Sequence, residues 1–109
     1  MTTASKPQSP ALRIVLHAPT PDALARARAS ALNARKADAQ CSVRIIANAA
    51  AVAAALDQPH AEADPLTGLC PNTLGHTGRQ AHAPLTVLER PAVIELALLQ
   101  QAGWAYIHA

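Results

Sequence analysis

The chain has 109 residues, with nine Lys and Arg against seven Asp and Glu, which gives a formal net charge of +2. One Trp, one Tyr and no Phe leave few side chains for base stacking, so the composition argues against nucleic-acid binding. Half of the residues are apolar, but 27 are alanine, which buries little apolar area. A thin core in so short a chain predicts one domain that completes its burial by self-association.

The first ten residues are polar and contain two prolines, which predicts a disordered leader over residues 1–10 and a single domain over residues 11–109. The leader has no apolar core of the kind found in secretion signals. No run approaches the ~20 apolar residues of a membrane span, so we expect no membrane association. Two cysteines, Cys41 and Cys70, are too few for a disulfide scaffold. Together these features predict a cytoplasmic protein with free thiols.

Five apolar segments alternate with helical patterns. We expect strands over 12–17, 42–47, 66–70, 85–88 and 104–107. Thr20 is the expected cap of a helix that runs to about residue 38, and Asn48 is the expected cap of a second helix that runs to residue 56. Residues 57–65 form a loop, and residues 71–84 predict a flexible connection with at most one helical turn. The alternation predicts an α/β domain with three layers, α/β/α, around a mostly parallel five-stranded sheet.

The last expected helix begins at Pro91 and is stopped by Gly103. Its Val93, Leu96, Ala97 and Gln100 share one face. Ile94, Leu98 and Leu99 make most of its remaining surface apolar as well. A helix that is apolar nearly all round must be covered, which again favours self-association.

Candidate functional residues follow the strands, because ligands in open parallel sheets collect at the carboxyl ends of the strands. His17 ends the first strand, Asn48 follows the second, and Cys70 follows the third, with Asn72 and Thr73 just beyond it. Cys70 combines a nucleophilic atom with a strand-to-helix turn, whose backbone N–H groups stabilise a thiolate. An accessible thiolate of this kind can carry a persulfide. Burial of Cys70 as a small hydrophobe is the alternative, and for Cys41 we expect partial burial.

Three further groups of side chains do not predict a site. Cys70, His76 and His82 are spaced six apart, which suits neither a zinc hook nor a helical pair, so we expect no metal and no cofactor. The two histidines are expected in a loop, where one of them could assist the thiol as a base. Basic side chains spread round the first helix predict a solvated surface rather than a phosphate site: Arg26, Arg28, Arg35 and Lys36.

Two segments carry a resemblance to a known family: residues 70–74, Cys-Pro-Asn-Thr-Leu, and residues 91–107, which end in Leu-Leu-Gln-Gln-Ala-Gly-Trp-Ala-Tyr-Ile. With the strand that ends in Ala47 and Asn48, they resemble the short single-domain DsrE/DsrF-like proteins, related to the DsrE and TusD sulfur-relay proteins. The resemblance implies a parallel five-stranded α/β/α domain that forms trimers or hexamers. It also implies a sulfur-accepting cysteine after the third strand, a position that only Cys70 occupies. Alanines 49 and 50 depart from the family, which usually has glycine after this Asn.

These features predict a sulfur-relay protein that receives sulfane sulfur on Cys70 from a sulfurtransferase and passes it to an acceptor protein. Asn72 and Thr73 would position the thiolate, and His17 and Asn48 would line its approach. We expect a carrier, or weak sulfurtransferase activity at most. The alternative is a non-catalytic oligomeric module that binds a small ligand or a protein partner, and a thiol-dependent enzyme that uses His76 or His82 is a weaker third reading.

Overall fold

The computed structural model describes residues 11–109, and the expected leader, residues 1–10, lies outside them. Five parallel strands form one sheet in the order β4-β3-β2-β1-β5, which confirms the expected α/β fold class. The elements in chain order are β1 (Arg13–Ala18), α1 (Pro21–Ala37), β2 (Ser42–Ala47), α2 (Ala50–Asp57), the 3-10 turn η2 (Asp64–Leu66), β3 (Thr67–Leu69), α3 (Pro71–Thr77), β4 (Thr86–Val87), α4 (Ala92–Gln101) and β5 (Ala105–His108).

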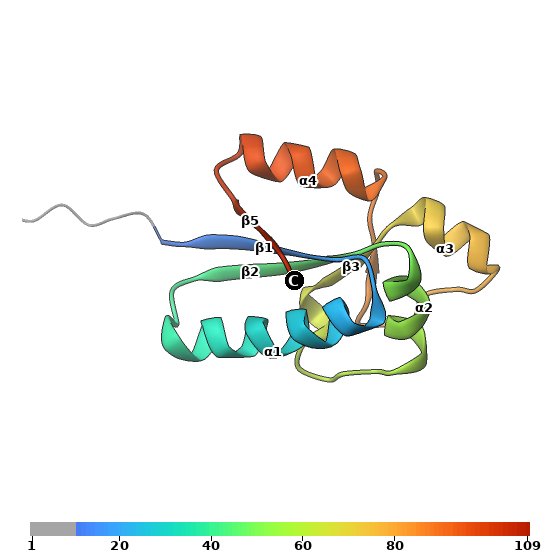
Figure 1. Ribbon diagram of the computed structural model, residues 1–109, viewed down its shortest axis with the longest axis horizontal. Helices are drawn as coiled ribbons and strands as arrows, with labels where there is room; N and C mark the ends of the chain where they lie inside the picture. Colours follow the sequence, from blue (N-terminus) through green and yellow to red (C-terminus); the bar gives the residue numbers. More distant parts are fainter. Residues whose placement is uncertain (1–10) are drawn as a thin grey trace, which may run out of the picture.

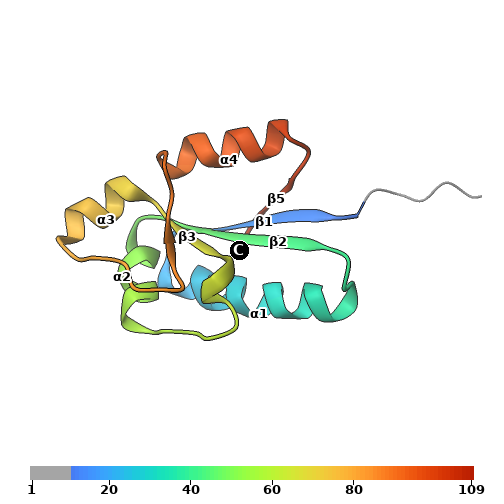
Figure 2. The same ribbon diagram turned by 180° about the vertical axis from the view of Figure 1, so that it is seen from behind.

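Helices cover the two faces of the sheet unequally. Helices α1 and α2 lie on one face, α4 alone lies on the other, and α3 extends beyond the carboxyl ends of the strands (Figures 1 and 2). Strand β1 is an interior strand: it pairs with the central strand β2 over all six of its residues and with the edge strand β5 on its other side. The carboxyl ends of β1, β2 and β3 therefore lie together beside the turns into their helices.

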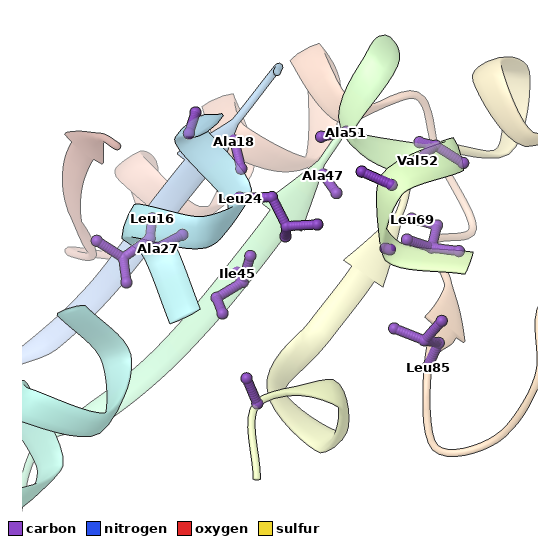
Figure 3. Packing of buried hydrophobic residues seen from close by; sticks show 14 of the residues in the cluster. Leu16, Ala18, Leu24, Ala27, Ile45, Ala47, Ala51, Val52, Leu69 and Leu85 are labelled. Atoms are coloured by element: carbon purple, nitrogen blue, oxygen red, sulfur yellow. The ribbon is translucent and has the colours of Figure 1, made fainter. Parts of the chain in front are cut away.

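The larger core fills the α1/α2 face. Leu16, Ile45 and Leu69 point from three neighbouring strands toward Leu24 of α1 and Val52 of α2 (Figure 3). All five are buried. Small alanines on the inner face of α1 let this helix lie close to the sheet: Ala23, Ala27 and Ala31. Alanine therefore contributes here by permitting close packing rather than by its own area.

The smaller core lies under α4. Val15 and Ile46 point to this face because they alternate with Leu16 and Ile45 along their strands. The other members of this core are Cys70, Leu88, Ala92, Leu96 and Leu99, with Trp104 packed against them. Arg44 of β2 also points to this face and bonds to the carboxylate of Glu95 on α4 at 3.1 Å. The α4 face thus mixes a small apolar core with charged groups.

Local details of two turns differ from the sequence prediction. Thr20 caps α1 as expected, since its hydroxyl accepts a hydrogen bond from the Ala23 N–H at 3.0 Å. Asn48 does not cap α2: the capping position belongs to Ala49, which makes no side-chain cap bond. The expectation of at most one helical turn after Cys70 was wrong, because α3 continues to Thr77 before Gly78 ends it in a left-handed conformation (φ 68°).

Arg28 was expected on a solvated surface, and this prediction was wrong. Its side chain is 8% exposed and bonds to the carboxylate of Asp64 at 3.3 Å. The other oxygen of Asp64 accepts a hydrogen bond from the His60 N–H at 3.0 Å. The ion pair therefore holds residues 57–65, which connect α2 to β3, against α1.

Candidate functional site

Cys70 sits where β3 turns into α3. Its N–H donates to the carbonyl of Ala47 on β2 at 2.9 Å, and its own carbonyl accepts from the Leu74 N–H at 3.0 Å. The first bond extends the sheet pairing by one residue, and the second begins the helix. The backbone of Cys70 is therefore held at the N-cap position of α3.

Several hydrogen-bond donors converge on the Cys70 sulfur. The Ala92 N–H at the start of α4 donates to Sγ at 3.4 Å. The Asn72 and Thr73 N–H groups and the Thr73 hydroxyl lie near the sulfur and lower the pKa of the thiol, although the side chain of Cys70 makes no cap hydrogen bond to the first turn of α3. Burial raises the pKa of the thiol, but these donors together outweigh it, so the Cys70 pKa lies below its ordinary value of 9.0. The turn thus favours a thiolate relative to an ordinary cysteine.

Access to this sulfur is restricted. Cys70 is only 6% exposed and packs with Val15, Ile46 and Leu96 in the smaller core. The prediction of a thiol presented to solvent is therefore wrong for the single chain, and the alternative of a buried cysteine describes its exposure better. A cysteine that is merely a small hydrophobe would have a raised pKa, however, because nothing would stabilise its charged form. Cys70 is thus a buried thiol with donor groups of Asn72, Thr73 and Ala92 around its sulfur, and we call this group the sulfur nest.

Thr73 connects the Cys70 turn to the end of β2. Its hydroxyl oxygen accepts a hydrogen bond from the Ala49 N–H at 3.2 Å. Ala49 makes this contact with φ 49° and ψ −138°, a conformation that favours glycine. The backbone approach that a glycine would permit here is therefore made by an alanine, under strain.

A second polar group gathers round His17 at the carboxyl end of β1. His17 Nε2 lies 2.9 Å from Asn48 Oδ1, and Nδ1 lies 2.6 Å from the Tyr106 hydroxyl. The ring of His108 packs edge-on against the His17 ring, with centroids 5.5 Å apart. The sequence analysis missed Tyr106 and His108, because nothing in the chain order indicates that β5 pairs with β1. The only signal was that Tyr106 is the single tyrosine.

His17, Asn48 and Tyr106 form the floor of a cleft of about 450 Å³ beneath α4. Its other wall is the helix face identified from the sequence: Val93, Leu96, Ala97 and Gln100. This confirms that the four residues share a face. Cys70 is not among the residues that line the cleft. The structure thus brings His17 and Asn48 together, but in a cleft that does not include the sulfur.

The remaining candidates stand apart. His76 is exposed in the last turn of α3, and His82 Nε2 lies 3.4 Å from the Leu56 carbonyl. Over residues 11–109 no three metal-capable side chains gather into one cluster. Cys41 is partly buried against the larger core, as expected. None of the helices in this part of the chain has the length and apolarity to cross a membrane.

No protein-family model and no curated protein matches the chain. The resemblance to the DsrE/DsrF-like family therefore stays a prediction, and the functional argument depends on the geometry of the two sites.

Proposed function

We propose that the protein is a sulfur carrier in which the Cys70 thiolate accepts sulfane sulfur and passes it on. The observation that carries this proposal is the hydrogen bond from the Ala92 N–H to Sγ at 3.4 Å at a strand-to-helix turn, where the nearby Asn72 and Thr73 donors help to lower the pKa of the buried thiol. Thiolates are the attacking species in exchange reactions of sulfur. A free thiol of this kind suits a reducing compartment, so we place the reaction in the cytoplasm.

The transfer needs no oxidant. A lone pair of the Cys70 thiolate attacks the outer sulfur of a persulfide or polysulfide donor and forms a new S–S bond. The S–S bond of the donor breaks, and its electron pair leaves on the donor thiolate. Cys70 then bears a persulfide anion, whose terminal sulfur an acceptor thiolate removes by the same step in reverse. The Asn72, Thr73 and Ala92 donors stabilise the negative charge at both ends of the cycle.

The small exposure of Cys70 constrains the donor. At 6% exposure the sulfur offers little area to a second protein. Small polysulfide species are therefore better donors than a sulfurtransferase, unless such a partner first displaces α3 or the 78–91 connection. The acceptor is subject to the same constraint.

Intact-mass measurement after exposure to inorganic polysulfide tests the proposal. We expect the parent and Cys41→Ala to gain one sulfur atom and Cys70→Ala to gain none. An adduct that follows Cys41, or no adduct at pH 7 to 8, would contradict the carrier.

A matched pair of variants tests the role of the nest. Thr73→Val removes the hydroxyl donor and keeps the shape of the side chain, so we expect it to raise the pKa of the Cys70 thiol and to slow alkylation by iodoacetamide several-fold at neutral pH. Thr73→Ser keeps the hydroxyl and should react like the parent. Equal rates in the two variants would show that the hydroxyl does not stabilise the thiolate.

A non-catalytic oligomeric module is the second candidate, favoured by the burial of Cys70 and by apolar side chains on the outside of α4. Ile94 is 47% exposed and Leu98 is 40% exposed. Neighbouring apolar side chains of this kind are typical of a surface that binds another copy, and we propose a trimer or hexamer. Analytical ultracentrifugation should find that the parent is associated and that the double variant Ile94→Lys/Leu98→Lys is monomeric. A monomeric parent at micromolar concentration would contradict self-association.

A further inference from the structure

The cleft under α4 has the composition of a small-molecule site. Its volume, about 450 Å³, falls within the roughly 300 to 1,000 Å³ of typical ligand pockets. One wall is aliphatic, made by Val93, Leu96 and Ala97, and the floor is the hydrogen-bonded group of His17, Asn48 and Tyr106. An aliphatic wall beside a few convergent polar groups is what an amphiphilic small molecule requires.

The hydrogen bonds of His17 determine what the floor can offer. With Asn48 Oδ1 as acceptor, Nε2 carries the proton of the neutral ring, so Nδ1 accepts from the Tyr106 hydroxyl. A second proton on Nδ1 reverses that bond: Nδ1–H donates to the Tyr106 oxygen, and the hydroxyl proton becomes free for a ligand. Asn48 uses its oxygen for His17, which leaves its Nδ2–H groups as donors. The protonated floor therefore offers donors and a positive charge.

The surrounding groups favour a negative ligand. The residues that line the cleft include no carboxylate and no lysine or arginine. His17 meets Tyr106 and His108 from β5 and Asn48 from the end of β2, and Gln100 of α4 also lines the cleft. The other charged groups on this face of the sheet are engaged: Arg13 donates to the Ala102 carbonyl, and Arg44 and Arg90 both bond to Glu95. His17 and His108 are thus the basic side chains next to the cleft floor.

We propose that this cleft binds a small aliphatic monocarboxylate, with its chain against Val93 and Ala97 and its carboxylate accepting from the Asn48 Nδ2–H and the Tyr106 hydroxyl, beside the positive charge of protonated His17. Binding and protonation of His17 are then coupled, because each favours the other. The inference makes the binding-module alternative specific and does not depend on sulfur transfer at Cys70.

Hexanoate is a suitable probe. Hexanol lacks its charge and acetate lacks its aliphatic chain, so these two serve as control ligands. Titration followed by NMR at pH 5.5 should show saturable shifts of the His17 imidazole and Tyr106 ring resonances with hexanoate. We expect the affinity for hexanoate at pH 8 to be at least about tenfold lower, because a ligand that shifts the titration midpoint of His17 by one pH unit binds the protonated form tenfold more tightly. Saturating hexanoate should then move the midpoint of the His17 titration upward by about one pH unit. Hexanol and acetate should each bind more weakly than hexanoate.

Two helix variants test the location. Ala97→Phe fills the cleft from an exposed position and should abolish the shifts, whereas Gln101→Phe adds the same ring to an exposed position of α4 that does not line the cleft and should leave them intact. Tyr106→Phe should lower the affinity at pH 5.5 by about tenfold, the effect of losing one charge-assisted hydrogen bond.

The proposal is overturned if hexanoate gives no saturable shift at pH 5.5, if hexanol binds as tightly, or if Ala97→Phe binds like the parent. A chain with Cys70→Ala separates the two proposals. If Cys70→Ala still binds hexanoate, the cleft binds its ligand independently of Cys70, whether or not the parent takes up sulfur. Loss of binding in Cys70→Ala would show that the cleft and the sulfur turn are one site.

Discussion

The two faces of the sheet differ in what covers them and in what they contain. On the α1/α2 face two helices bury a continuous apolar core that runs from Leu16 to Leu85 (Figure 3). On the α4 face one helix covers a smaller core, and the sulfur nest, the His17 group and the Arg44–Glu95 pair all lie on that side. The first face therefore stabilises the fold, and the second gives polar groups the partial burial that chemistry needs.

Coverage explains this difference. Strand β4 has two residues and β3 has three, so α4 packs mainly over the other half of the sheet, where it contacts β2 and β5. The helix also keeps Ile94 and Leu98 exposed on its other sides. A thinly covered face leaves room for a cleft, and it leaves apolar surface that another copy of the chain can bury.

The largest expected effect is on the buried pair of Arg28 and Asp64. Asp64→Ala leaves the buried Arg28 guanidinium without its carboxylate, and its Nε already has no hydrogen-bond partner among residues 11–109. We expect a loss of about 3 to 5 kcal/mol in the free energy of unfolding, measured with urea. Asp57→Ala is the control, because its pair with Arg79 is exposed and should contribute about 1 kcal/mol or less. Equal losses would mean that the Arg28–Asp64 pair is not effectively buried.

A direct comparison of the two faces uses one leucine from each. Leu24→Ala removes a fully packed side chain of the α1/α2 core and should lower the free energy of unfolding by about 3 to 5 kcal/mol. Leu96→Ala opens a site beside the cleft, where the surroundings can relax, so we expect about 2 to 3 kcal/mol. A larger loss for Leu96→Ala would contradict the view that the α4 face is the weaker one.

The sequence was sufficient for the fold but not for the arrangement of the site. The pattern of apolar residues identified every strand of the sheet, because strand formation depends on the backbone preference and burial of neighbouring residues. The partners of His17 depend instead on β5 joining the sheet beside β1, a contact between residues 89 positions apart. No local pattern carries that information, so Tyr106 could not be predicted.

The exposure of Cys70 was missed for a related reason. Its place at a strand-to-helix turn, and the donors from Asn72 and Thr73, follow from neighbouring residues. Its cover comes from Leu96 and Ala92, which reach it only because α4 folds back over the sheet. Arg28 differs from the other basic residues of α1 in the same way, since Asp64 arrives from a distant loop.

Strain at Ala49 gives the next prediction. A residue at φ 49° and ψ −138° is costly for alanine, and glycine adopts the same backbone without a Cβ penalty. We expect Ala49→Gly to raise the free energy of unfolding by about 1 kcal/mol after the entropy of the unfolded glycine is counted. Ala50→Gly, one residue later at the start of α2, should instead destabilise by a few tenths to about 1 kcal/mol. A loss in both variants would show that position 49 is not strained.

The smallest expected effect concerns the charge on Cys70 and tests the α4 face directly. Donors on Sγ lower the pKa of this thiol below its ordinary value of 9.0 despite burial, so the folded chain releases the proton at lower pH than the unfolded chain. Between the two pKa values the unfolded state binds more protons, and the contribution of Cys70 to stability must rise with pH. This contribution is complete above pH 9 and is lost as pH falls through the folded pKa.

The difference in unfolding free energy between the parent and Cys70→Ala should therefore grow from pH 7 to pH 9. Thr73→Val should flatten that growth and Thr73→Ser should keep it. A difference that shrinks with pH would show that burial outweighs the donors, and Cys70 would then resemble the apolar side chains on the opposite face.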